Sequence, residues 1–183
     1  NIRTEIIGEE MIKQYSKTNN IQTLLDSSSI LPNQILFTKK MRALTNNNTP
    51  IQPVDLKEFN FRASFQTEQT FQVNSGISKQ IVNTWNDSKK IFRYINRVRF
   101  SHQTYPLFID LSIVKSSSSK KYVQIPQYTI QESNVFKNSE TYEIEIELDN
   151  HKIGYKESTT LEYLTTMIKK TIRIILTGLQ NTK

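Results

Sequence analysis

Apolar and charged residues alternate most regularly over residues 142–149, which read Tyr-Glu-Ile-Glu-Ile-Glu-Leu-Asp. Glutamate is a poor strand former, but strict alternation with isoleucine and leucine is typical of a β-strand with two unlike faces. Such a strand places Glu143, Glu145 and Glu147 on one face, with neighbouring carboxylates about 6.5–7 Å apart. Because these like charges repel one another, we expect something positive between them, and a hard divalent cation such as Mg²⁺ or Mn²⁺ is the economical solution.

The same alternation predicts further strands. Arg93, Ile95, Arg97 and Arg99 would share one strand face, with Phe92, Tyr94, Val98 and Phe100 on the other. The predicted strands cover residues 35–42, 59–65, 91–100, 107–115 and, more briefly, 122–130.

Helical spacing appears at both ends of the chain. One or two short helices are predicted over residues 9–25, and a long amphipathic helix over 157–179. Residues 45–53 are predicted to form a loop, and residues 78–85 a loop or short helix. The fold class is therefore α+β, dominated by strands with flanking helices.

Strands with one apolar and one charged face allow two arrangements. An open sheet would turn the charged faces to solvent, where the acidic strand would discourage edge pairing. A closed barrel would turn them inward and bury the apolar faces under helices. The long apolar face of the C-terminal helix needs a surface to cover, which favours the barrel.

Composition narrows the function classes. The 183 residues carry a net charge of +7, which favours an anionic partner such as nucleic acid or polyphosphate. With no cysteine and two histidines, thiolate chemistry is excluded and a histidine zinc site is improbable. We find no membrane span and no secretory pattern, so we expect an intracellular protein or a piece of one.

Three segments carry a resemblance to a known family: residues 92–100 (FRYINRVRF), 108–117 (FIDLSIVKSS) and 142–148 (YEIEIEL). In this order and spacing they resemble the RNA 5′-triphosphatase domain of mRNA capping enzymes from large DNA viruses, a group within the triphosphate tunnel metalloenzymes. The resemblance covers about residues 31–180. Residues 172–183 resemble the link that precedes the guanylyltransferase domain in those multidomain enzymes.

The resemblance implies an antiparallel eight-stranded β-barrel, the triphosphate tunnel, with flanking helices. It implies that residues 1–183 form a single domain of a larger capping enzyme, which hydrolyses the γ-phosphate of 5′-triphosphate RNA to leave diphosphate-ended RNA. Implied partners are that RNA and the guanylyltransferase and methyltransferase domains, without a membrane. The implied location is the cytoplasmic viral factory or the virion.

The resemblance also assigns residues. Glu143, Glu145 and Glu147 would bind Mg²⁺ or Mn²⁺, which prefer oxygen ligands. Arg93 and Arg97 would contact the triphosphate, and Glu145 or Glu147 would act as general base. Further phosphate contacts are expected from Lys115, Arg62 and Arg99, and from Lys39 with Lys40 on a basic strand.

Two features depart from the family. Its first strand carries Glu-x-Glu, whereas residues 1–5 are interpreted as the chain just after that strand, and the middle cation of the basic strand is replaced by Ile95. Arg99 is a candidate substitute. Two alternatives stay open: a tunnel-fold phosphatase for polyphosphate or nucleotides, and a non-catalytic RNA-binding or subunit-contact module with a degenerate metal site.

Overall fold

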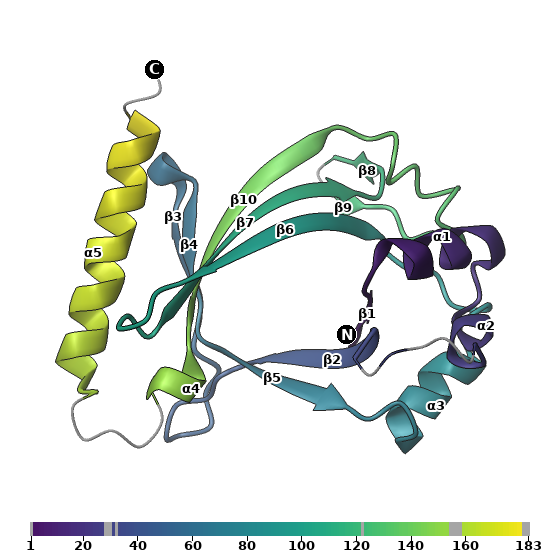
Figure 1. Ribbon diagram of the computed structural model, residues 1–183, viewed down its shortest axis with the longest axis horizontal. Helices are drawn as coiled ribbons and strands as arrows, with labels where there is room; N and C mark the ends of the chain where they lie inside the picture. Colours follow the sequence, from purple (N-terminus) through teal and green to yellow (C-terminus); the bar gives the residue numbers. More distant parts are fainter. Residues whose placement is uncertain (1, 28–30, 32, 122, 154–158, 181–183) are drawn as a thin grey trace. The chain divides into compact units, whose positions relative to one another are not determined.

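The computed structural model describes residues 2–27, 31, 33–121, 123–153 and 159–180 (Figure 1). The chain forms two compact units. Unit 1 comprises Asn1–Lys90 with Gln127–Glu132, and unit 2 comprises Ile91–Pro126 with Ser133–Lys183. The expected α+β class is confirmed, since every strand pairing is antiparallel and five α-helices accompany the sheets in the described part of the chain.

Unit 1 is built on a three-stranded sheet in the order β1-β2-β5, with a separate β3-β4 hairpin. Its strands are β1 (Ile2–Ile6), β2 (Ile35–Arg42), β3 (Val54–Leu56), β4 (Phe61–Ala63) and β5 (Gln66–Phe71). Its helices are α1 (Glu9–Thr18), α2 (Ile21–Leu25), the 3₁₀ turn η1 (Lys57–Phe59) and α3 (Gly76–Asn83).

The core of unit 1 gathers around a buried aromatic pair. The Trp85 and Tyr15 rings meet edge to face at 6.0 Å, and the Trp85 indole N–H donates to the Tyr15 hydroxyl at 3.2 Å and the Asn19 carbonyl at 3.0 Å. Asn19 ends α1 in the left-handed region with φ 54°, where asparagine is well tolerated. Burial of the phenol raises the pKa of Tyr15 to about 12.

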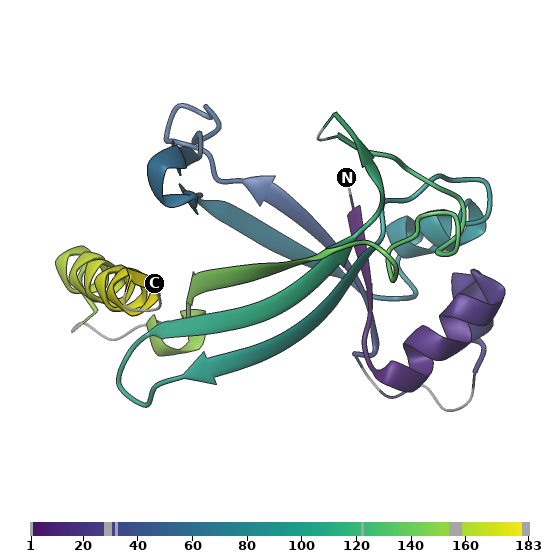
Figure 2. The ribbon, with the colours of Figure 1, turned by 90° about the horizontal axis from the view of Figure 1, so that it is seen from above.

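Unit 2 is built on the three-stranded sheet β10-β7-β6, whose long strands run side by side in Figures 1 and 2. The strands are β6 (Arg93–Ser101), β7 (Leu107–Ser116) and β10 (Glu140–Leu148). Smaller elements are β8 (Ser119–Lys120), β9 (Val123–Gln124), α4 (Asn150–Ile153) and α5 (Leu161–Gln180).

The unit 2 sheet inverts the usual burial of a soluble sheet. On its apolar face Tyr142 is 74% exposed, and Ile144 and Leu111 are exposed as well. Glu143, Glu145 and Glu147, on the other face, are only partly exposed. The alternation predicted for residues 142–149 is therefore confirmed, and the charged face is the more sheltered one.

Helix α5 confirms the long C-terminal helix, although residues 157 and 158 of the predicted range lie outside the described residues. Its Tyr163 hydroxyl donates to the Thr104 carbonyl and its Lys170 ammonium donates to the Tyr105 hydroxyl, so the helix contacts the β6–β7 turn. No described helix is long and apolar enough to cross a membrane.

Two predicted strands are wrong in extent. Residues 59–65 do not form one strand, because Asn60 turns into the left-handed region with φ 50° after η1 and only Phe61–Ala63 continue as β4. Within residues 122–130 the strand is limited to Val123–Gln124, and Tyr122 lies outside the described residues. The described strands form sheets of three, three, two and two, so the closed eight-stranded barrel stays a prediction.

Candidate functional site

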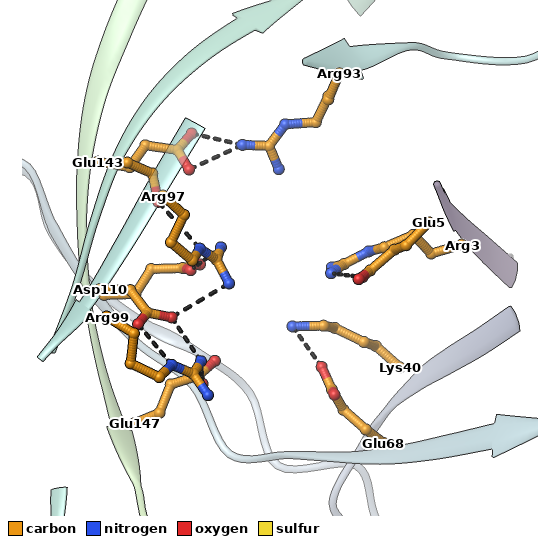
Figure 3. Close-up of polar contacts among 12 residues, drawn as sticks. Arg3, Glu5, Lys40, Glu68, Arg93, Arg97, Arg99, Asp110, Glu143 and Glu147 are labelled. Carbon is orange, nitrogen blue, oxygen red and sulfur yellow. Dashed lines mark hydrogen bonds and ion pairs between the residues drawn. The ribbon is translucent and has the colours of Figure 1, made fainter. Parts of the chain in front are cut away.

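The charged face of the β10-β7-β6 sheet brings the sequence-predicted arginines and glutamates together (Figure 3). Antiparallel register places Ser112 of β7 opposite both Arg97 of β6 and Glu143 of β10. Two residues earlier on β7, Asp110 lies opposite both Arg99 of β6 and Glu145 of β10. We call this surface the arginine–glutamate face; its members are Arg93, Arg97, Arg99, Asp110, Ser112, Glu143, Glu145 and Glu147.

Each arginine of β6 reaches over the central strand to a glutamate of β10. The Arg93 Nη2 donates to both carboxylate oxygens of Glu143 at 2.8 Å. Arg97 Nη2 donates to Glu145 Oε2 at 2.7 Å. Arg99 Nη2 donates to Glu147 Oε2 at 3.0 Å. The three glutamates of β10 therefore have guanidinium partners from the same sheet.

Asp110 anchors two of these arginines, Arg97 and Arg99. Its side chain is fully buried, and its two oxygens accept from Arg99 Nε at 2.7 Å and Arg99 Nη2 at 2.6 Å. Arg97 Nη1 lies 3.2 Å from Asp110 Oδ2, and Arg97 Nε donates to the Ser112 hydroxyl at 3.1 Å. The hydrogen bonds from Arg99 lower the pKa of Asp110, and the same pair raises the pKa of Arg99. Asp110 therefore holds a fixed negative charge that orients two guanidinium planes.

The arginine–glutamate face has donors suited to a hard divalent cation. Its four carboxylates exceed its three arginines by one negative charge. Oε1 of Glu145 and Oε1 of Glu147 accept no hydrogen bond from a described residue. In the described part of the chain no three His, Cys, Asp or Glu side chains converge on one metal position. Mg²⁺ is commonly held by one or two carboxylates plus substrate phosphates, so the two free oxygens fit such a cation.

The β1-β2-β5 sheet of unit 1 has a charged face of its own, also drawn in Figure 3. Arg3 and Glu5 of β1 pair at 2.9 Å, and Lys40 of β2 pairs with Glu68 of β5 at 2.6 Å. Residues 2–6 form a full strand, which the sequence pattern did not predict. This strand carries Arg3 and Glu5 on one face.

Lys115 is on the same sheet as the arginine–glutamate face but does not belong to that face. Lys115 points to the opposite face of the same sheet, where it pairs in register with Tyr94 and Glu140, and its ammonium donates to the Phe136 carbonyl. We therefore leave Lys115 out of the site.

In unit 1, Lys39 lies on the face of β2 opposite to Lys40, since neighbouring strand residues alternate. Arg62 forms a two-pronged pair with Asp55 on the β3-β4 hairpin, at 2.6 and 3.0 Å. Lys39 and Arg62 belong to unit 1, whereas the arginine–glutamate face belongs to unit 2.

Sequence reasoning missed Asp110 and Ser112 as site residues. A signal existed, because Ile109-Asp110-Leu111-Ser112 alternates like the flanking strands and puts both polar side chains on one face. It also missed the pairs made by Glu5 and by Glu68, which lie on short strands with little apolar alternation.

No family model matches the chain, and no curated protein and no solved structure is significantly similar to it.

Proposed function

We propose that this chain is a metal-dependent RNA 5′-triphosphatase, which removes the γ-phosphate of 5′-triphosphate RNA and leaves a diphosphate end for guanylylation. The observation that carries the proposal is the row of three arginine–glutamate pairs on one sheet face, with Arg97 and Arg99 anchored by the buried Asp110. The resemblance of residues 92–100, 108–117 and 142–148 to viral capping triphosphatases supports it.

The arginine–glutamate pairs suit a substrate whose phosphate oxygens can replace the glutamate carboxylates as partners of the arginines. Guanidinium forks bind phosphate oxygens in the same two-pronged way in which they bind carboxylates. A triphosphate lying on this face would therefore take over hydrogen bonds of neighbouring arginines in the row. The glutamates released in this way become available to a cation and to water, so anion and cation binding would support each other.

Phosphoryl transfer depends mainly on positioning and charge neutralisation. Arg93 and Arg97 would orient the phosphate oxygens, and Asp110 would keep Arg97 and Arg99 aligned. Glu145 or Glu147 would accept a proton from the attacking water through its free oxygen. Mg²⁺ or Mn²⁺ bound by Glu145 and Glu147, with Glu143 beside them, would neutralise charge on the phosphates.

The proposal includes the closed eight-stranded tunnel of the family and a place in a larger capping enzyme beside guanylyltransferase and methyltransferase domains. In such a barrel the charged faces of both three-stranded sheets would have to line one interior. The proposed location is accordingly the cytoplasmic viral factory or the virion.

A phosphate-release assay on 5′-triphosphate RNA tests the proposal. We expect phosphate release with Mg²⁺ or Mn²⁺, loss of release after chelation, and a diphosphate-ended product. Competition between the RNA and tripolyphosphate tests the alternative of a polyphosphatase, which is favoured if tripolyphosphate is the preferred substrate. RNA binding with no phosphate release under either metal would contradict catalysis and favour the non-catalytic RNA-binding module.

A further inference from the structure

A polar pocket lies where β7 ends and β10 begins, and it plays no part in the function proposed above. Its volume is about 390 Å³, within the range of about 300–1,000 Å³ usual for small-molecule sites. We call it the serine pocket; its lining residues are Val114, Ser116, Ser117, Ser118, Ser119, Asn138, Ser139 and Thr141.

Part of this lining is fixed by hydrogen bonds to the backbone. The buried Ser117 hydroxyl accepts from the Phe92 N–H at 2.7 Å, and the Asn138 amide donates to the Ser116 carbonyl at 2.8 Å. The Thr141 hydroxyl donates to the Val114 carbonyl at 3.3 Å. These bonds tie the pocket wall to the sheet, so its shape is set by β7 and β10.

Other hydroxyls of the lining are uncommitted. The Ser116, Ser119 and Ser139 side chains make no hydrogen bond with any described residue. Each hydroxyl can both donate and accept, so together they suit a ligand that itself carries hydroxyl groups. The described residues that line the pocket include no Lys, Arg, Asp or Glu. A neutral polyol therefore fits this lining better than a phosphate, which would seek the neighbouring arginines.

The register connects the serine pocket to the arginine–glutamate face. Ser116 is the direct partner of Arg93, and Thr141 lies two residues before Glu143 on the same face of β10. The pocket thus begins where the row of arginines ends. From Arg97 to Arg93 the strand advances about 13 Å at the usual rise per residue.

We propose that the serine pocket binds the ribose of the first nucleoside of the triphosphate substrate. This inference rests on the proposed function, since it needs a phosphate chain along the arginines. It also gives that chain a direction: the α-phosphate lies nearest Arg93, and the γ-phosphate lies on the side of Arg97. The free serine hydroxyls then meet the sugar, and the 2′-hydroxyl is the group that distinguishes RNA from DNA.

Binding measurements with three probes test this assignment. The probes are a short 5′-triphosphate RNA, the DNA oligonucleotide of the same sequence with a 5′-triphosphate, and tripolyphosphate, all with Ca²⁺ replacing Mg²⁺ to slow turnover. The wild-type chain should bind the RNA about 3–10-fold more tightly than the DNA, the value of one neutral hydrogen bond. In the double variant Ser116→Ala/Ser139→Ala this preference should fall to within about twofold, while tripolyphosphate affinity stays unchanged.

Ser101→Ala is the matched control, since Ser101 lies on the same face at the opposite end of β6 and should preserve the RNA preference. A second variant, Ser116→Leu, should fill the pocket and weaken RNA and DNA alike without affecting tripolyphosphate. If wild-type protein binds all three probes without preferring RNA, the ribose assignment is wrong and the proposed function stands. If none of the probes binds, the proposed function fails and the ribose assignment fails with it.

Discussion

Replacing Asp110 by asparagine removes the buried charge that holds two arginines of the arginine–glutamate face. Asparagine has nearly the same shape, so the change deletes charge and acceptor capacity without opening a cavity. It leaves one oxygen for Arg99 and turns an amide donor towards Arg97 and the second Arg99 nitrogen. Three contacts between 2.6 and 3.2 Å are weakened or reversed.

The expected cost follows from burial. Removing one partner of a buried ion pair typically costs about 3–5 kcal/mol. Here the arginine side chains are 33% and 44% exposed, so water and the nearby glutamates recover part of that loss. We therefore expect Asp110→Asn to lower the free energy of unfolding by about 2–3 kcal/mol at pH 7.

Asp55→Asn is the matched control for this variant. Asp55 forms the same two-pronged pair with Arg62, but both side chains are exposed, so its loss should cost much less than the loss of the buried Asp110 charge. Urea unfolding followed by circular dichroism measures both variants, and hydrogen exchange of β7 amides localises the effect. The reasoning is refuted if Asp110→Asn costs no more than Asp55→Asn.

The same pair predicts a pH dependence. Because the folded pKa of Asp110 is lowered, its contribution is present above the unfolded pKa near 3.8 and is lost as pH falls through the lower folded value. The stability difference between wild type and Asp110→Asn should therefore shrink in acid below about pH 4. A difference that stays constant down to pH 2 would show that charge is not its origin.

Three further predictions concern other parts of the chain. Tyr15 should remain protonated up to about pH 12 in the folded chain, so the free energy of unfolding should fall as pH rises above 10 in wild type but not in Tyr15→Phe. Urea unfolding measures this difference, and an ionisation of Tyr15 near pH 10 in a spectrophotometric titration would contradict its burial. Ser75→Ala should cost about 1 kcal/mol, because the Ser75 hydroxyl caps α3 by accepting from the Ser78 N–H, whereas exposed Ser88→Ala should cost almost nothing; equal midpoints in urea would disprove the cap. Tyr142→Thr should leave the urea midpoint nearly unchanged, since the ring is 74% exposed, and a clear loss of stability in the same assay would show that the ring is packed.

The strands of the arginine–glutamate face were predictable because alternation has a period of two, which sets the faces of a strand without tertiary information. The sequence therefore indicated that Arg93, Arg97 and Arg99 share one face, as the glutamates of β10 do. Alternation within one strand does not reveal which arginine meets which glutamate. That depends on the register of β6 and β10 against β7, which places Ser112 between Arg97 and Glu143.

Register also explains the residues that sequence reasoning misplaced. Lys115 is an odd number of positions from Asp110 on β7, so the two side chains lie on opposite faces of the sheet. Only the pairing of β7 with β10 shows that Asp110 is on the face that carries the glutamates. Lys39 and Lys40 are neighbours on opposite faces, and pairing with Glu68 selects Lys40. Asp110 was missed because its burial depends on strands at distant positions in the sequence.

The breaks in predicted strands have a local cause. Residues 59–65 alternate well, but asparagine adopts positive φ at low cost, and Asn60 uses that freedom to end η1 before β4. The alternation of the phenylalanines did not predict this turn. Closure of the sheets into a barrel likewise depends on pairings that no single strand encodes.

Phosphate release by two glutamine variants of β10 tests the central claim most directly. Glu145 lies on the arginine–glutamate face and Glu140 on the opposite face of the same strand, where it accepts from the Tyr142 hydroxyl. With Mg²⁺ and 5′-triphosphate RNA, Glu145→Gln should lower the rate by about 100-fold or more, and Glu140→Gln should keep the wild-type rate. Equal rates for Glu145→Gln and the wild-type chain would show that the arginine–glutamate face is not the catalytic site.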